Sequence, residues 1–226
     1  HAANALRCDK RVDAQLVQQK RLYQLRLRQW RGHLQQRFAG GGLVALGTDT
    51  PLAAPAFTLP DTRGAKHSLA QYRGQWVVLE WLNYGCPYVN KHYRSGNIPG
   101  QQQTWRDRGV VWLAVVSSAP GEQGHYEPAR MNRESEKMKS NASAVLLDPA
   151  GTVGRMYDAR VTPHMFVIDP KGTLVYMGGI DDVPTTRERD LERAKQLVDA
   201  ALEEGTAGKP VSTPTSRPYG CNVKYR

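Results

Sequence analysis

Cys86 is the residue of this 226-residue chain that is best placed to do chemistry. It follows an apolar, β-branched run at residues 77–82 and a short Asn-Tyr-Gly stretch, and Pro87 comes next. This order predicts a buried strand, a tight turn and a cysteine at the first turn of a helix, where proline is favoured at the first helical position. Unpaired N–H groups and the positive end of the helix dipole favour the nucleophilic thiolate there. The alternative is a small core residue, as free cysteines in apolar segments often are.

A second motif lies further along the chain, at Thr162 and Pro163. The segments 164–168 and 173–176 that follow are rich in apolar and β-branched side chains, and Asp-Pro-Lys-Gly separates them. This pattern predicts a β-hairpin. Pro163 stands at the first residue of the first strand, where a proline does not interrupt the ladder of hydrogen bonds.

The order of these motifs resembles thioredoxin-fold proteins of the peroxiredoxin or redoxin type. Residues 54–61 and 68–74 are similar to the start of redoxin domains. Residues 86–93 resemble the Cys-Pro-[Phe/Tyr]-Val-x-Lys-His-Tyr motif of a bacterial, AhpC/TSA-related peroxiredoxin-like group. The resemblance implies a thioredoxin-like α/β fold over residues 51–205, with a central mixed sheet and helices on both faces. It also implies that Pro163 is cis and packs against Cys86.

Two positions depart from the better known relatives. The second cysteine of a thioredoxin Cys-x-x-Cys site is replaced by Val89, and the threonine that typical peroxiredoxins carry three residues before their cysteine is replaced by Asn83. The resemblance still implies that Cys86 attacks a peroxide or a protein disulfide. In the same way it implies that Thr162 and Pro163 shape the substrate groove.

Glu80 is the only charged residue of its apolar strand, six positions before Cys86. Thioredoxins carry a buried acid at this offset, so the resemblance implies that Glu80 transfers protons to and from the cysteine. Burial raises the pKa of a carboxyl group and brings it into the range useful for acid–base work. The alternative is that Glu80 lies on a solvated face or pairs with Lys or Arg.

Cys221 is a candidate second sulfur. It lies in the ending Tyr-Gly-Cys-Asn-Val-Lys-Tyr, to which the family resemblance extends, and it follows a Gly-, Pro-, Ser- and Thr-rich stretch at residues 205–218. This composition predicts a flexible tail over residues 206–226. We hypothesise that Cys86, once oxidised to sulfenic acid, condenses with Cys221 to a disulfide. A structural disulfide and an unpaired tail thiol are the alternatives.

Histidine side chains near these cysteines raise the question of a metal. Cys86, His92, His164 and Cys221 could converge, and thiolate with imidazole suits copper or zinc. Copper-chaperone relatives place two cysteines within one short motif, which this chain lacks, and a histidine at a strand start is more often structural. The sequence therefore predicts no metal and no cofactor.

Apolar runs and helical spacing give the remaining elements. Strands are predicted near 76–81, 110–117, 145–148, 164–168 and 173–178, and helices near 87–107, 129–141, 151–157 and 187–203. Strands interleaved with helices indicate an α/β sheet covered on both faces. No run of 18 apolar residues is present in the sequence, so no transmembrane helix is predicted.

Charge is concentrated at the N-terminal end. The chain carries a net charge of +10, of which residues 1–50 supply nine Lys or Arg against three Asp. Within this extension, apolar residues recur at helical spacing over 12–38, which predicts a basic amphipathic helix. Such a helix packs on its own domain, docks on a protein partner or lies on an anionic membrane. Nucleic acid is not expected, because no known nucleic-acid module accompanies it.

The sequence thus predicts a thiol-dependent oxidoreductase, a peroxiredoxin-like antioxidant enzyme. The alternative is a non-catalytic accessory subunit of a larger, membrane-associated assembly, docked through its N-terminal helix, because a fold does not fix a function. The small residues at positions 1–5 are compatible with cleavage of an export signal, so we expect a periplasmic or otherwise exported protein, with a cytoplasmic one as the alternative.

Overall fold

The computed structural model of the chain describes Leu25 and residues 52–226. The predicted helix at 12–38 therefore lies outside the described residues, apart from Leu25, which is helical and exposed. Cys8 lies outside them as well. Within the described part of the chain, no helix has the length and apolar character needed to cross a bilayer.

A five-stranded mixed sheet forms the centre of the domain, with the strand order β5-β4-β3-β7-β8. The strands are β3 (Val77–Trp81), β4 (Val111–Val116), β5 (Ala144–Leu147), β7 (His164–Ile168) and β8 (Leu174–Gly178). The first three are parallel, whereas β7 is antiparallel to β3 and β8 is antiparallel to β7. The predicted mixed sheet and the predicted hairpin are both confirmed.

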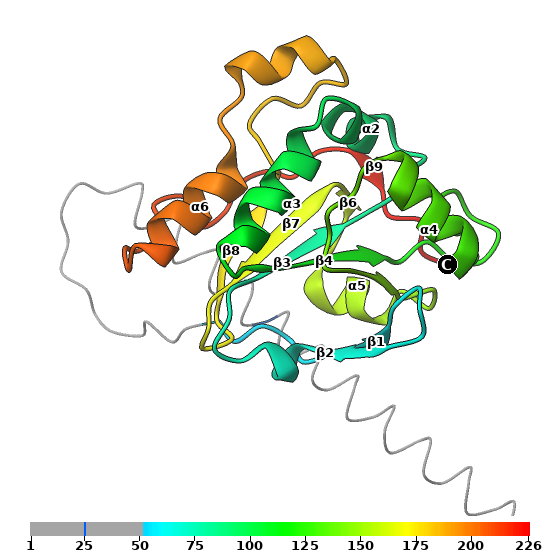
Figure 1. The fold of residues 1–226 in the computed structure, drawn as a ribbon, viewed down its shortest axis with the longest axis horizontal. Coiled ribbons are helices and arrows are strands. Elements are labelled where there is room, and N and C mark those ends of the chain that lie inside the picture. Colours follow the sequence, from blue (N-terminus) through cyan, green and yellow to red (C-terminus); the bar gives the residue numbers. More distant parts are fainter. Residues whose placement is uncertain (1–24, 26–51) are drawn as a thin grey trace, which may run out of the picture.

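Helices cover both faces of this sheet, as Figure 1 shows. On one side lie α2 (Pro87–Arg94), α3 (Asn97–Asp107), α4 (Pro128–Lys137) and α6 (Leu197–Thr206). The other side is covered by α5 (Thr152–Tyr157), the 3-10 helix η1 (Leu69–Tyr72) and a small hairpin of β1 (Thr58–Pro60) and β2 (Lys66–Ser68). The remaining elements are β6 (Val161–Thr162), β9 (Cys221–Asn222) and the 3-10 helix η2 (Glu188–Arg193).

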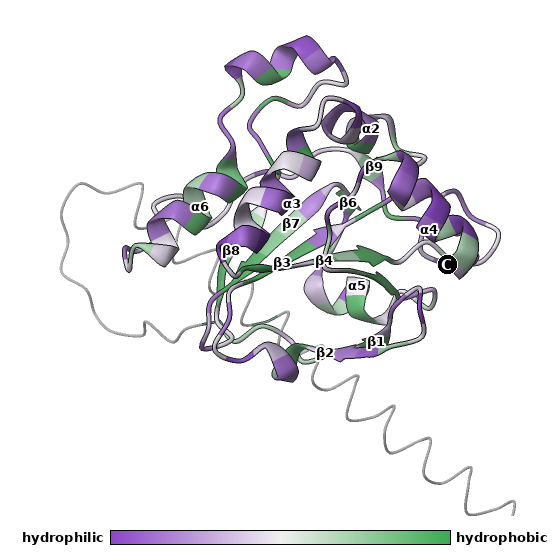
Figure 2. Cartoon of the chain, in the orientation of Figure 1, coloured by the Kyte–Doolittle hydropathy of each residue, from purple (hydrophilic) through white to green (hydrophobic). Residues whose placement is uncertain are grey.

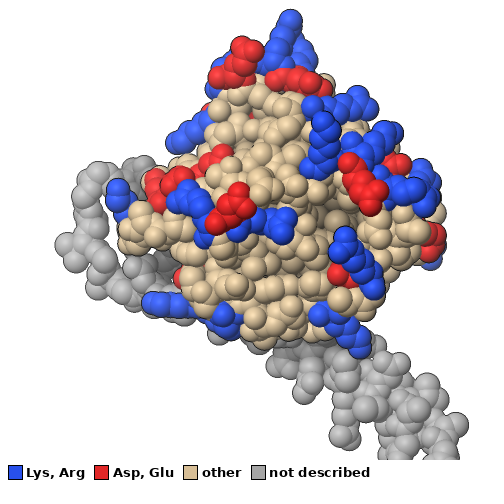
Figure 3. Space-filling view, in the orientation of Figure 1, with Lys and Arg blue, Asp and Glu red and all other residues tan. Residues whose placement is uncertain are grey.

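Side chains of the central strand alternate between the two faces of the sheet. Val78 joins the core beneath α2 and α3, while Val77, Leu79 and Trp81 join the core beneath α5. Every residue of β3 is buried, because both faces are covered. Apolar residues accordingly concentrate in the central strands, and hydrophilic ones lie on the helices around them (Figure 2). On the face drawn in Figure 3, acidic and basic side chains are interspersed.

Two predicted helices are interrupted. The predicted helix 87–107 is two helices, because Gly96 adopts a left-handed conformation with φ of 78° between α2 and α3. The predicted helix 187–203 is also divided, into η2 and α6. Between them the Lys195 N–H donates to the Asp182 carboxylate at 2.9 Å, which draws the chain away from a helical path.

The C-terminal segment is bound to the domain instead of forming the flexible tail that its composition predicted. It passes along β8, where the Met177 N–H donates to the Pro214 carbonyl at 3.0 Å, and its strand β9 pairs with β6. Beyond β9, the Val223 N–H donates to the Arg160 carbonyl at 2.9 Å. These backbone bonds satisfy the polar groups of a segment that has few apolar side chains of its own.

Candidate active site

Cys86 lies at the N-cap of α2, directly after the turn that follows β3. Its N–H donates to the Asn83 carbonyl at 3.0 Å, and the Asn83 side chain accepts a bond from the Gly85 N–H at 2.8 Å. Asn83, which stands where peroxiredoxins have threonine, therefore shapes the turn that delivers the cysteine. Pro87 occupies the first helical turn, as the sequence predicted. The Cys86 side chain is completely buried.

The Thr162–Pro163 segment lies against this thiol. The peptide bond between the two residues is cis, as the resemblance implied. Cys86 Sγ donates a hydrogen bond to the Thr162 carbonyl oxygen at 3.1 Å. The sequence analysis expected the sulfur to face the unpaired N–H groups of α2; the structure directs it to this carbonyl instead, because the cis-proline loop brings the oxygen within reach.

Cys221 lies next to Thr162 as well. In the β6–β9 pair, Cys221 stands opposite Thr162. Both cysteines therefore contact the same residue, since the Thr162 carbonyl accepts the Cys86 thiol. Cys221 packs against the core that contains Cys86, and both described cysteines are free thiols. Partial burial, followed by a hydrogen bond to Cys86 and the charge of that residue, raises the pKa of Cys221. Cys221 is therefore a protonated thiol at neutral pH.

Gly220 makes this close approach possible. Its φ of 140° is one that residues with a side chain rarely adopt, and an added Cβ would lie 2.0 Å from the Thr162 carbonyl oxygen. Only a glycine lets the tail backbone rest on the loop that also holds Cys86.

Glu80 is buried in the core under α2 and α3. Among the described residues it forms no salt bridge, and its side chain does not face solvent. Three neutral groups donate hydrogen bonds to its carboxylate: the Tyr93 hydroxyl at 2.9 Å, the Gln102 amide at 3.1 Å and the Trp112 indole at 2.8 Å. Burial raises the pKa of Glu80 to about 7, against the opposing effect of these donors. The carboxyl group is therefore poised to exchange a proton near neutral pH, and its transfer of that proton to a cysteine stays a prediction.

Similarity to known proteins identifies the family of this domain. Residues 52–177, more than half of the chain, match the sequence pattern described as the AhpC/TSA family. The chain belongs to the AhpC/TSA family. No curated protein matches it as a whole or in part.

Solved structures show the same fold for this AhpC/TSA protein. A hypothetical protein from Sinorhizobium meliloti is 24% identical, with a TM-score of 0.64 over 82% of this chain and 97% of the other. An uncharacterised conserved protein from Geobacillus kaustophilus is 22% identical, with a TM-score of 0.67 over 82% and 98%. The thioredoxin domain of a thiol-disulfide oxidoreductase from Bacteroides vulgatus is 21% identical, with a TM-score of 0.45 over 67% and 98%. The first two likenesses show that this fold recurs in other bacterial proteins over most of the chain.

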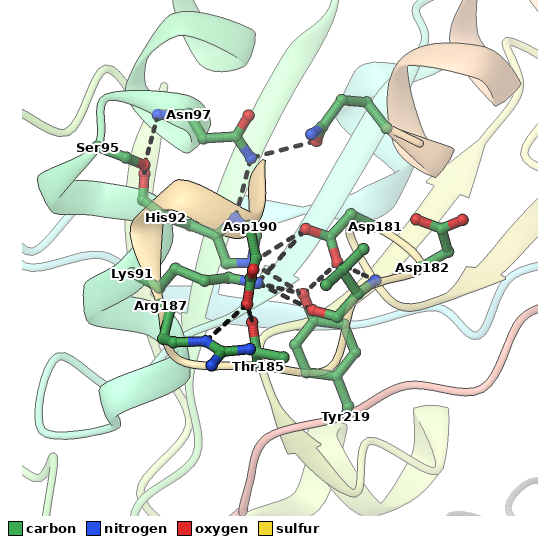
Figure 4. A network of polar contacts seen from close by, with 12 residues as sticks. Lys91, His92, Ser95, Asn97, Asp181, Asp182, Thr185, Arg187, Asp190 and Tyr219 are labelled. Atoms are coloured by element: carbon green, nitrogen blue, oxygen red, sulfur yellow. Dashed lines mark hydrogen bonds and ion pairs between the residues drawn. The ribbon is translucent and has the colours of Figure 1, made fainter. Parts of the chain in front are cut away.

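A buried polar cluster beside the cysteines of this AhpC/TSA domain was missed by the sequence analysis. It consists of Lys91 and His92 on α2, Asp181 in the loop after β8, and Tyr219 in the tail; we call it the Tyr219 cluster (Figure 4). The Lys91, His92 and Asp181 side chains are all completely buried. Its residues belong to two motifs of the sequence, Lys-His after Cys-Pro-Tyr-Val-Asn and Tyr-Gly-Cys in the tail. The two motifs are far apart in the chain, so no local pattern indicates that they meet.

The two histidines that were considered as metal ligands, His92 and His164, make contacts with other groups. His92 belongs to the Tyr219 cluster. The ring of His164 lies at a tilt against Phe166, with 4.5 Å between ring centres, and its Nδ1 accepts a bond from the Arg160 N–H at 3.3 Å. Among the described residues, no set of three or more His, Cys, Asp or Glu side chains is arranged to hold a metal ion.

Proposed function

We propose that this protein is a thiol-dependent oxidoreductase in which Cys86 is the nucleophile and Cys221 the resolving thiol. The observation that carries the proposal is the position of Cys221: this residue, 135 positions further along the chain (221 − 86), is paired with Thr162, whose carbonyl accepts the Cys86 thiol, and it packs against the core that contains Cys86. Such an approach needs a strand pair, a glycine at φ of 140° and a bound tail, all of which are present. In this proposal Thr162 and Pro163 hold the two sulfurs beside one another.

The reaction follows from the two thiols. With a peroxide, the Cys86 thiolate attacks one oxygen, the O–O bond breaks, and water or an alcohol leaves once its oxygen is protonated; Cys86 becomes a sulfenic acid. Cys221 then loses its proton and attacks the Cys86 sulfur, which forms the disulfide and releases water. The peroxide gains two electrons and the thiols lose them. An external dithiol reduces the disulfide by exchange and closes the cycle.

A small peroxide is the oxidant that the site accommodates best. Cys86 is completely buried, and β9 is paired with the backbone of Thr162, whose carbonyl contacts the sulfur. A protein disulfide would have to displace this strand before it reached Cys86, whereas a peroxide needs only a small opening. A protein disulfide is the second candidate substrate, because exchange through the half-buried Cys221 requires less movement of the tail.

The non-catalytic accessory subunit has one observation in its favour. The complete burial of Cys86, with its thiol bonded to a carbonyl oxygen, is what a structural cysteine also shows. A purely structural role for Cys86 does not explain why a second thiol lies close to it, or why a glycine lets the tail approach. A chemical test separates the two proposals.

The test is a disulfide map after oxidation. The Cys8→Ser protein, which retains only Cys86 and Cys221, is reduced, mixed with one equivalent of hydrogen peroxide, alkylated and digested. We expect a peptide that joins Cys86 to Cys221, and in a Cys221→Ser variant a sulfenic acid on Cys86 that dimedone captures. Two fully alkylated cysteines after this treatment would favour the accessory subunit.

A further inference from the structure

The hydroxyl of Tyr219 makes all the hydrogen bonds that a phenol can make. It donates to one carboxylate oxygen of Asp181, and it accepts from Lys91 Nζ at 3.1 Å and from His92 Nε2 at 3.0 Å. One donated and two accepted bonds use the whole capacity of the oxygen. Burial and the bond to Asp181 raise the pKa of Tyr219, so the hydroxyl keeps the proton that it donates. Figure 4 shows these bonds converging on the hydroxyl oxygen.

His92 is neutral and held in one tautomer. Its Nδ1 accepts a bond from the Asn97 amide at 2.9 Å, so Nε2 carries the proton and donates it to Tyr219. Burial, and then the neighbouring charge of Lys91, lower the pKa of His92 to about 3. Its contribution to the cluster is therefore the same across the physiological pH range.

Lys91 and Asp181 form a buried ion pair around the same hydroxyl. Lys91 Nζ lies 3.5 Å from Asp181 Oδ2, donates to the Val183 carbonyl at 3.0 Å and stands 5.1 Å from the centre of the Tyr219 ring. Burial lowers the pKa of Lys91, and the charge of Asp181 opposes this effect. A buried pair of this kind adds little net stability compared with apolar packing, and its best attested use is to select one arrangement of the chain.

The arrangement selected here places two chain segments side by side. Cys86 begins α2, which also carries Lys91 and His92, and Tyr219 precedes Cys221 by two residues. Gly220, between them, rests on the Thr162 carbonyl. The cluster thus fixes the tail to the helix of the nucleophile, at the point where the second thiol must arrive.

We infer that Tyr219 is the positioning residue for Cys221: its hydroxyl, held by Lys91, His92 and Asp181, keeps the tail thiol against Cys86 and the tail backbone over the buried sulfur. The part of this inference that concerns the disulfide rests on the proposed function, whereas the part that concerns the covering of Cys86 does not. The cluster sets the effective concentration of one thiol at the other. It also limits the access of reagents to Cys86.

The decisive variant is Tyr219→Phe, made in the Cys8→Ser protein. It keeps the ring, which meets Tyr88 edge-on at 5.7 Å and lies under Lys91, and it removes only the hydroxyl. One measurement is the equilibrium between the dithiol and the Cys86–Cys221 disulfide in glutathione buffers, which gives the effective concentration. The other is the rate at which iodoacetamide alkylates Cys86 in the reduced protein.

We expect the effective concentration to fall by about tenfold to a hundredfold and the alkylation rate to rise by a similar factor, since the hydroxyl bonds to charged groups. Tyr157→Phe is the matched control: it removes a buried hydroxyl that donates to the Pro55 carbonyl at 2.7 Å in the other core. It should lower the melting temperature while leaving both thiol measurements unchanged. If Tyr219→Phe does not fold, His92→Leu removes one donor to the hydroxyl and should shift both measurements in the same direction.

Equal effective concentrations and equal alkylation rates in Tyr219→Phe and the parent protein would overturn the inference. If the parent protein forms no disulfide between Cys86 and Cys221, the proposed function fails. The alkylation rates then still decide whether Tyr219 keeps the tail over Cys86, so the two failures are distinguishable.

Discussion

Replacing Glu80 with glutamine should change how the stability of the protein depends on pH. The Glu80 carboxyl group is completely buried and receives hydrogen bonds from Tyr93, Gln102 and Trp112. Its pKa is raised from 4.5 to about 7, and burial is the main cause. The folded protein therefore binds a proton here more tightly than the unfolded chain does. The contribution of this group to stability is fully present below the unfolded pKa of 4.5 and is lost as the pH rises through about 7.

The size of the effect follows from the shift. A rise of the Glu80 pKa from 4.5 to about 7 corresponds to about 3 kcal/mol in the free energy of unfolding between the acid and alkaline limits. Glutamine resembles the neutral carboxyl group in shape and does not titrate. Its amide faces donors, which lowers stability by about 1–3 kcal/mol, but by an equal amount at every pH. The difference in unfolding free energy, Glu80→Gln minus the parent, should become more favourable by about 3 kcal/mol from pH 4.5 to pH 8.

Urea unfolding of the two proteins, followed by tryptophan fluorescence at several values between pH 4.5 and pH 8, measures this difference. Groups other than Glu80 titrate in both proteins and cancel in the subtraction, as long as they lie away from the substituted side chain. Two stability curves that run parallel across this range would refute the assignment of a near-neutral, buried carboxyl group to Glu80.

Further variants test the thiol chemistry. Glu80→Gln should also alter the pH dependence of Cys86 alkylation by iodoacetamide if the carboxyl group exchanges protons with the sulfur; identical profiles would confine Glu80 to a structural role. Cys221→Ser should prevent disulfide formation and leave Cys86 open to overoxidation by excess peroxide, which intact mass measures as added oxygen. Gly220→Ala places a Cβ 2.0 Å from the Thr162 carbonyl oxygen, so it should displace the tail and slow disulfide formation after peroxide by at least about tenfold, whereas Gly208→Ala, with open space around its Cβ, should not. An unchanged rate in Gly220→Ala would contradict the close approach of the tail.

Local sequence patterns were sufficient to predict the elements that carry Cys86. The apolar run of β3, the Asn-Tyr-Gly turn and Pro87 each act within a few residues, so their combined effect is visible in the sequence. The hairpin of β7 and β8 is predictable for the same reason. The cis bond before Pro163 came from the resemblance to redoxins and is confirmed.

The rest of the site depends on contacts between distant segments. A lysine at this position of a helix would ordinarily be solvated. The burial of Lys91 is possible because Asp181 and Tyr219, from distant segments, provide a counter-charge and a hydrogen-bond acceptor. The tail composition predicts flexibility, yet its backbone is paired with β6 and β8. The interruption at Gly96 was missed because a glycine within a helical pattern marks a break only when the chain must turn there.

The central claim is that Cys86 and Cys221 form a reversible disulfide, and the most direct test is the disulfide map of the Cys8→Ser protein after one equivalent of hydrogen peroxide. The account predicts loss of two hydrogens in the intact mass, a peptide joining Cys86 to Cys221, and recovery of both thiols on reduction. Sulfinic acid on Cys86 beside a free Cys221, or two thiols that stay free, would contradict it.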